Sequence, residues 1–170
     1  MGATSTRSDR GPRAGEAGYT YIGLLLLVAM IGIVLATAGV VWRTEMQRER
    51  EAQLLFVGEQ FAAAITDFYE RTPAGQRPRF PARLEELLDD PRWPTTKRHL
   101  RRLYVDPFTG EANWGLVPSP EGGILGVYSQ AAGTPLRRAN FPPRYQEAFE
   151  TAMTYADWRF VYIAPGSTGN

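Results

Sequence analysis

Few side chains in this sequence could carry out chemistry, and their spacing does not favour catalysis. The chain of 170 residues has one histidine, His99, and no cysteine. A histidine-based metal cluster or a Ser–His–Asp triad therefore lacks parts, and neither a thiolate site nor a disulfide can form. The carboxylate pairs Glu85–Glu86 and Asp89–Asp90 are adjacent in sequence, and adjacent residues on a helix point in different directions. These residues predict a protein that is not an enzyme.

The single histidine lies in a basic run, KRHLRR at 97–102. Such a run could meet an acidic partner or lipid headgroups, but charge runs are usually surface, and we expect a solvated helix face. Lys and Arg number 19 and Asp and Glu 18, so the net charge of +1 gives no reason to expect nucleic acid as a partner. Because Asp106, Glu111 and Glu121 show no ligand spacing, no metal site is predicted, and no cofactor is expected.

The longest feature of the sequence is an uncharged stretch from Ala17 to Trp42. A helix needs roughly 20 apolar residues to cross the hydrocarbon layer, so this stretch is long enough to span a membrane. A buried helix is disfavoured because so small a domain could hardly surround it. A cleaved signal peptide is disfavoured because signal cores are about 7 to 15 residues long. The arginines ahead of the stretch favour an uncleaved anchor, with everything after Arg43 exported.

Beyond Arg43 the sequence becomes charged but keeps a helical pattern. Apolar residues recur at steps of three or four, at Leu54, Val57, Phe61, Ile65 and Phe68. No proline occurs between Pro12 and Pro73, so the pattern predicts one continuous helix from about Tyr19 to Tyr69. Its apolar stripe needs cover, which we expect from the C-terminal half of the chain.

The segment GYTYIGLLLLVAMIGIVLA, at 18–36, resembles the N-terminal signature of type IV pilins and type II secretion pseudopilins. In that family a short basic leader ends in glycine, an aromatic residue follows, and a hydrophobic helix continues into an amphipathic half. The resemblance implies that a prepilin peptidase cuts between Gly18 and Tyr19 on the cytoplasmic side, and that the new amine of Tyr19 is methylated. A glycine before the cut lets the backbone enter a narrow cleft without a side chain that would clash.

The resemblance also implies assembly with other pseudopilin or pilin subunits, through residues that include Leu24, Leu26, Val28 and Ile31. Gly23 stands where family members mostly carry a glutamate, which is thought to meet the free amine of a neighbouring subunit. Two explanations stay open. The subunit sits at a filament tip, where no earlier subunit presents an amine, or Gly23, Gly32 and Gly39 thin the helix so that neighbours pack closely.

The C-terminal half predicts short elements joined by loops rich in proline and glycine. We expect helical segments at Leu84–Asp90, Thr96–Tyr104 and Pro143–Tyr155, and strands at Asn113–Val117, Ile124–Ser129 and Trp158–Ile163. Three short strands suggest a small antiparallel sheet that covers the apolar stripe. The predicted fold class is α+β, and it resembles the pilin fold: one long N-terminal helix, membrane-spanning in its first half, packed against a small antiparallel sheet.

The predicted organisation is a cytoplasmic leader at 1–18, a transmembrane half of the helix at 19–42, an amphipathic half at 43–71 and a periplasmic globular domain at 72–170. The resemblance implies a minor or tip pseudopilin of a type II secretion system in the inner membrane, with its N-terminus cytoplasmic. Its implied partners are the prepilin peptidase, sister subunits and the inner-membrane platform of the secretion system. Alternatives are a minor pilin of a type IV pilus and a membrane-tethered periplasmic binding module that does not assemble.

Overall fold

The computed structural model describes residues 16–164, with side chains for 19–35 and 42–164. Most of the leader predicted at 1–18 lies outside these residues. The chain divides into two compact units, the first ending at Thr44 and the second beginning at Glu45.

The longest element is helix α1, Glu16–Glu70, which supplies residues to both units. The single helix predicted from about Tyr19 to Tyr69 is confirmed, because no proline interrupts the hydrogen-bond ladder after Pro12. Within the described part of the chain, no helix combines the length and the apolar character that a membrane crossing requires.

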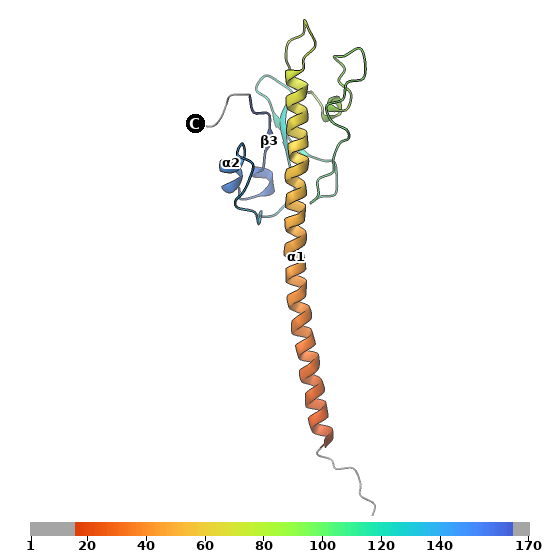
Figure 1. Ribbon diagram of the computed structural model, residues 1–170, viewed down its shortest axis with the longest axis vertical. Coiled ribbons are helices and arrows are strands. Elements are labelled where there is room, and N and C mark those ends of the chain that lie inside the picture. The colour runs from red at the N-terminus through yellow and green to blue at the C-terminus, as the bar shows by residue number, and fades with distance from the viewer. Residues whose placement is uncertain (1–15, 165–170) are drawn as a thin grey trace, which may run out of the picture. The chain divides into compact units, whose positions relative to one another are not determined.

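The second unit contains a three-stranded antiparallel sheet in the order β1-β2-β3, and Figure 1 labels the last of these strands, β3. Its strands are β1 Gly115–Pro118, β2 Ile124–Tyr128 and β3 Phe160–Val161. The register places Val127 of β2 opposite Leu116 on one side and Phe160 on the other. The α+β class with a small antiparallel sheet is therefore confirmed. The last strand is shorter than predicted because the Trp158 amide donates to the Tyr155 carbonyl, at the end of a helical turn.

Three short helical elements complete the second unit: η1 Leu84–Leu87, α2 Gln146–Glu150 and η2 Tyr155–Asp157. The helix predicted over Pro143–Tyr155 is too long. It stops after Glu150, and a capping box between Thr154 and Asp157 starts a separate 3-10 turn. The helical segment expected at Leu84–Asp90 is present only in part, as the 3-10 turn η1, which ends at Leu87.

The helix predicted at Thr96–Tyr104 is wrong, because this segment is irregular. The amides of His99 and Leu100 both donate to the carbonyl of Leu87, at 2.9 and 2.8 Å. A backbone amide committed to a distant carbonyl is not available for a helical ladder. Leu100 is buried, while Leu103 and Tyr104 are half-buried against the core.

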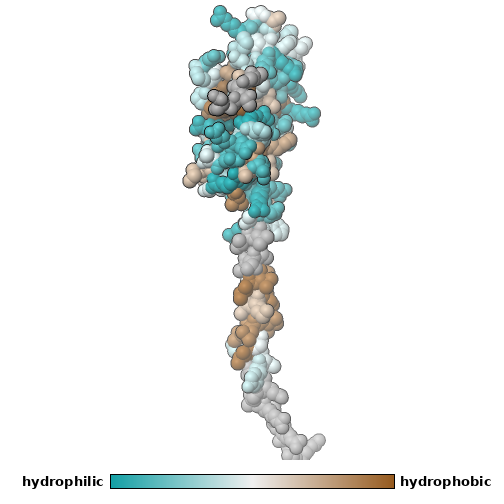
Figure 2. Space-filling model, turned by 60° about the vertical axis from the view of Figure 1, so that its left-hand side comes forward, coloured by the Kyte–Doolittle hydropathy of each residue, from teal (hydrophilic) through white to brown (hydrophobic). Residues whose placement is uncertain are grey.

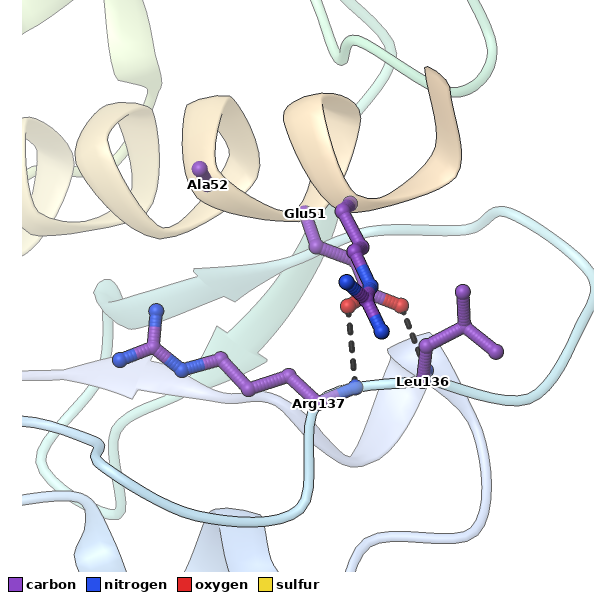
Figure 3. Close-up of a pocket in the computed structure, with 5 residues that line it drawn as sticks. Glu51, Ala52, Leu136 and Arg137 are labelled. Carbon is purple, nitrogen blue, oxygen red and sulfur yellow. Dashed lines mark hydrogen bonds between the residues drawn. The ribbon is translucent and has the colours of Figure 1, made fainter. Parts of the chain in front are cut away.

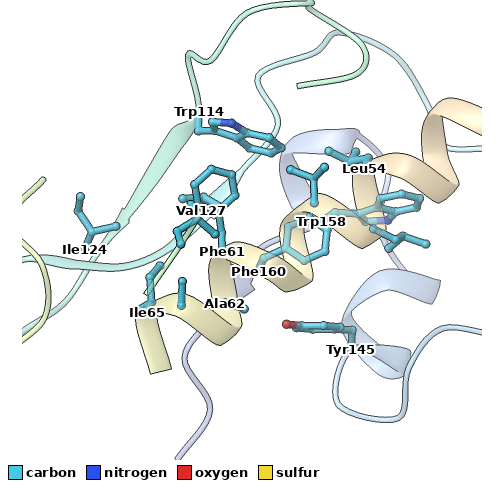
Figure 4. Packing of buried hydrophobic residues seen from close by; sticks show 14 of the residues in the cluster. Leu54, Phe61, Ala62, Ile65, Trp114, Ile124, Val127, Tyr145, Trp158 and Phe160 are labelled. Atoms are coloured by element: carbon cyan, nitrogen blue, oxygen red, sulfur yellow. The ribbon is translucent and has the colours of Figure 1, made fainter. Parts of the chain in front are cut away.

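The hydrophobic core lies between the second-unit part of α1 and the sheet. All five residues of the predicted stripe are buried, namely Leu54, Val57, Phe61, Ile65 and Phe68. Figure 4 shows Phe61 and Leu54 of α1 beside Val127, Trp158 and Phe160. The helix approaches β3 closely at Gly58, where an added Cβ would overlap the Phe160 ring. The close packing therefore depends on glycine at this position.

Candidate functional site

The first unit presents an apolar helical surface that no described residue covers. Every residue from 19 to 35 is exposed, and Figure 2 shows the hydrophobic colouring over this segment. Apolar side chains surround the helix instead of forming one stripe. A helix with apolar side chains on every face is typically buried against other apolar groups.

The residues predicted for processing and assembly all lie on this part of α1. Gly18 and Tyr19 both belong to the first turn of the helix, and Tyr19 is 82% exposed. The predicted assembly residues are each at least half exposed: Leu24, Leu26, Val28 and Ile31. Spacings of four and seven residues bring Leu24, Val28 and Ile31 to one face, whereas Leu26 lies on another. The structure thus groups three of the four.

Gly23, the position of the family's glutamate, lies in open space. A Cβ added there would meet no atom within 4 Å among the described residues. A side chain is therefore tolerated at this point of α1, and crowding within the described chain does not require glycine.

The second unit contains a buried polar cluster that the sequence did not predict, and we call it the His99 cluster. It consists of Asp67, Asp90, Arg92 and His99. The His99 ring is fully buried, with Nδ1 2.7 Å from Asp67 Oδ2 and Nε2 3.1 Å from Asp90 Oδ2. The solvated helix face expected for His99 is therefore wrong, because two carboxylates from elsewhere in the chain enclose the ring.

Arg92 connects the His99 cluster to the end of α1. Its guanidinium donates to both oxygens of Asp90 and to the carbonyl of Phe68, and it lies 3.6 Å from the centre of the Phe68 ring. The carbonyls of a last helical turn have no partner within the helix and interact favourably with cations. Arg92, which comes from outside α1, satisfies one of them.

Asp90 is ionised within this cluster. Burial alone raises the pKa of its carboxyl, but hydrogen bonds from Arg92 and His99 outweigh that effect and hold the pKa at about 2, below the ordinary 3.8. The Asp90 side chain is fully buried, which its place in an adjacent acidic pair did not predict.

The geometry of the His99 cluster argues against general acid–base catalysis. A catalytic base must come within hydrogen-bond distance of its substrate. The His99 and Asp90 side chains are fully buried and that of Arg92 is 4% exposed, so a substrate has no route to them. The cluster is built to hold the loop at 90–99 against α1.

A second polar cluster surrounds the buried carboxylate of Glu51 on α1 (Figure 3). Its Oε1 accepts from the Leu136 amide at 2.6 Å and the Tyr155 hydroxyl at 2.8 Å, and its Oε2 accepts from the Arg137 amide at 3.0 Å. A pocket of about 300 Å³ lies alongside. Three donors already serve the carboxylate, so its role is to fix the 136–137 loop on α1.

Tyr155 shares this environment. Burial raises the pKa of its hydroxyl, the negative Glu51 raises it further, and together they outweigh the opposite effect of the Gln47 hydrogen bond and bring the pKa to about 12. The hydroxyl therefore stays protonated at neutral pH and serves as a donor to Glu51.

Among the described residues, no group of three or more acidic or histidine side chains is arranged to hold a metal ion. Asp106, considered in the sequence as a metal ligand, is buried and accepts hydrogen bonds from the Phe108 amide and the Ser129 hydroxyl. Its oxygens already have protein partners.

Comparison with family models, with curated proteins and with solved structures finds no match to this chain.

Proposed function

We propose that this protein is a pseudopilin subunit of a type II secretion system, and that its fold is pilin-like. The observation that carries the proposal is helix α1. One continuous helix contains the predicted cleavage site in its first turn and is apolar and exposed all round at 19–35. Its apolar stripe at 54–68 is buried under the antiparallel sheet.

On this proposal the uncharged stretch anchors the chain once in the inner membrane, with the N-terminus cytoplasmic and the second unit periplasmic. A prepilin peptidase removes the leader at Gly18, and the exposed apolar helix later exchanges lipid for sister subunits. Assembly replaces one apolar environment with another, so close packing between helices supplies the specificity. Energy comes from a cytoplasmic ATPase acting through the inner-membrane platform.

Gly23 supports a minor or tip position. An isolated charge inside an apolar assembly costs several kcal/mol, and Gly23 offers no carboxylate to match a neighbour's amine. The same feature fits a membrane-tethered binding module that never assembles, and a minor pilin of a surface fibre shares the same chemistry.

The experiment that tests the proposal is mass spectrometry of the N-terminus of the membrane-bound protein. We expect a chain that begins with methylated Tyr19, and an unprocessed chain from a variant in which Gly18 is replaced by a bulky residue such as leucine. A native chain that begins at Met1 would favour the tether. A chain that lacks 24–42 would show an ordinary export signal and would refute both.

A further inference from the structure

The hydrogen bonds of His99 define its charge. An ionised carboxylate can only accept a hydrogen bond, and a neutral imidazole has one N–H donor. Both ring nitrogens of His99 face carboxylate oxygens, Asp67 Oδ2 and Asp90 Oδ2. Asp90 is ionised. Asp67 also forms an ion pair with Arg71, whose Nε lies 2.6 Å from Asp67 Oδ1. Both contacts are satisfied only when the ring carries two N–H groups and a positive charge.

The charged groups around the ring come from two segments. Helix α1 presents Asp67 with its partner Arg71, and the loop presents Asp90 with its partner Arg92. From η1 the Leu87 carbonyl meets the His99 amide, and the Phe68 ring packs against the imidazole with centroids 5.3 Å apart. The His99 ring therefore lies between two carboxylates, one at each ring nitrogen.

We propose that His99 is a proton-dependent latch: while its ring carries two N–H groups it holds the loop at 90–99 against the C-terminal end of α1, and loss of one proton releases that loop. After deprotonation, one ring nitrogen carries a lone pair that faces a carboxylate, either the fully buried Asp90 or Asp67, whose side chain is 29% exposed, and the lone pair and the carboxylate repel each other. An unmatched buried charge is strongly destabilising, so the loop moves outward to hydrate it. This inference does not depend on the proposed function.

The test uses the full chain in detergent micelles, followed from about pH 5, where imidazole is generally charged, to well above the range in which it loses its proton. His99 is the only histidine, so the ¹⁵N signals of its ring need no assignment. The Leu100 amide, bonded to Leu87, reports on the loop, and the Tyr162 amide, bonded to Leu125, reports on the core.

We expect the protection of the Leu100 amide from hydrogen exchange to fall about tenfold or more as the second ring N–H disappears, while protection at Tyr162 stays constant. In His99→Gln the Leu100 amide should be weakly protected at every pH. Asp89→Asn is the matched control, because Asp89 is exposed immediately before this loop, and it should behave like the native chain.

Two results would overturn the latch. One is a ring with a single N–H in the native chain while Leu100 is still fully protected. The other is an identical pH profile of Leu100 protection in the native chain and in His99→Gln. The ring spectrum of the native protein decides the first point even if the variant does not fold.

Discussion

The pKa of Asp90 predicts how the second unit responds to acid. The carboxyl has a pKa of about 2 in the folded protein, against 3.8 for the unperturbed group. At about 1.4 kcal/mol per pH unit, the difference corresponds to about 2 kcal/mol of folding free energy. Because the folded pKa is the lower one, this contribution is complete above pH 3.8 and is lost as the pH falls towards 2.

The perturbation that isolates this contribution is Asp90→Asn, which removes the titrating group. We expect the free energy of unfolding of the native chain to exceed that of the variant at about pH 6, and the gap to narrow by about 2 kcal/mol at about pH 2. Denaturant titrations followed by the fluorescence of the buried residues Trp114 and Trp158 would measure both values.

Asp89→Asn again serves as the control, since this exposed neighbour should show no such narrowing. A gap between the native chain and Asp90→Asn that is the same at both pH values would refute the reasoning. It would mean that Asp90 gains nothing from ionisation in the folded state, so that Arg92 and His99 do not stabilise it as the distances indicate.

Two other predictions concern α1. Gly58→Ala should destabilise the second unit by about 1 to 3 kcal/mol, because the new methyl group would overlap the Phe160 ring. Unfolding titrations would measure this loss of stability. Gly23→Ala is the control and should cause no loss of stability, because the space around the new methyl group is open. Glu51→Gln should lower the pKa of Tyr155 part of the way from about 12 towards 10, since burial persists after the charge is removed. NMR titration of the Tyr155 ring would measure that change, and an unaltered pKa would attribute the whole effect to burial.

The sequence predicts those parts of the fold that depend on local periodicity. The stripe from Leu54 to Phe68 could be recognised because its spacing follows the helical repeat, and all five of its residues are buried. The strand at Ile124–Tyr128 could be recognised because turn residues bound a short apolar run. Each of these two patterns spans about fifteen residues or fewer, so no tertiary contact was needed to interpret it.

The polar clusters could not be predicted, because their members are far apart in sequence. Asp67 and His99 are separated by 32 positions, and Glu51 and Tyr155 by 104. The run KRHLRR also misled the prediction, since the spacing of Leu100, Leu103 and Tyr104 imitates a helix. A lone histidine next to a leucine inside a basic run was the only local sign that part of this segment is buried.

The position of Phe160 in the chain determines when the core can close. Its ring occupies the space left by Gly58, and its strand completes the sheet beside Val127. Until Phe160 has been synthesised, α1 has no cover at Gly58. The apolar stripe of the helix then faces solvent on the side that Phe160 later covers. Closure therefore comes late in synthesis, and the apolar stripe is prone to aggregation during that interval.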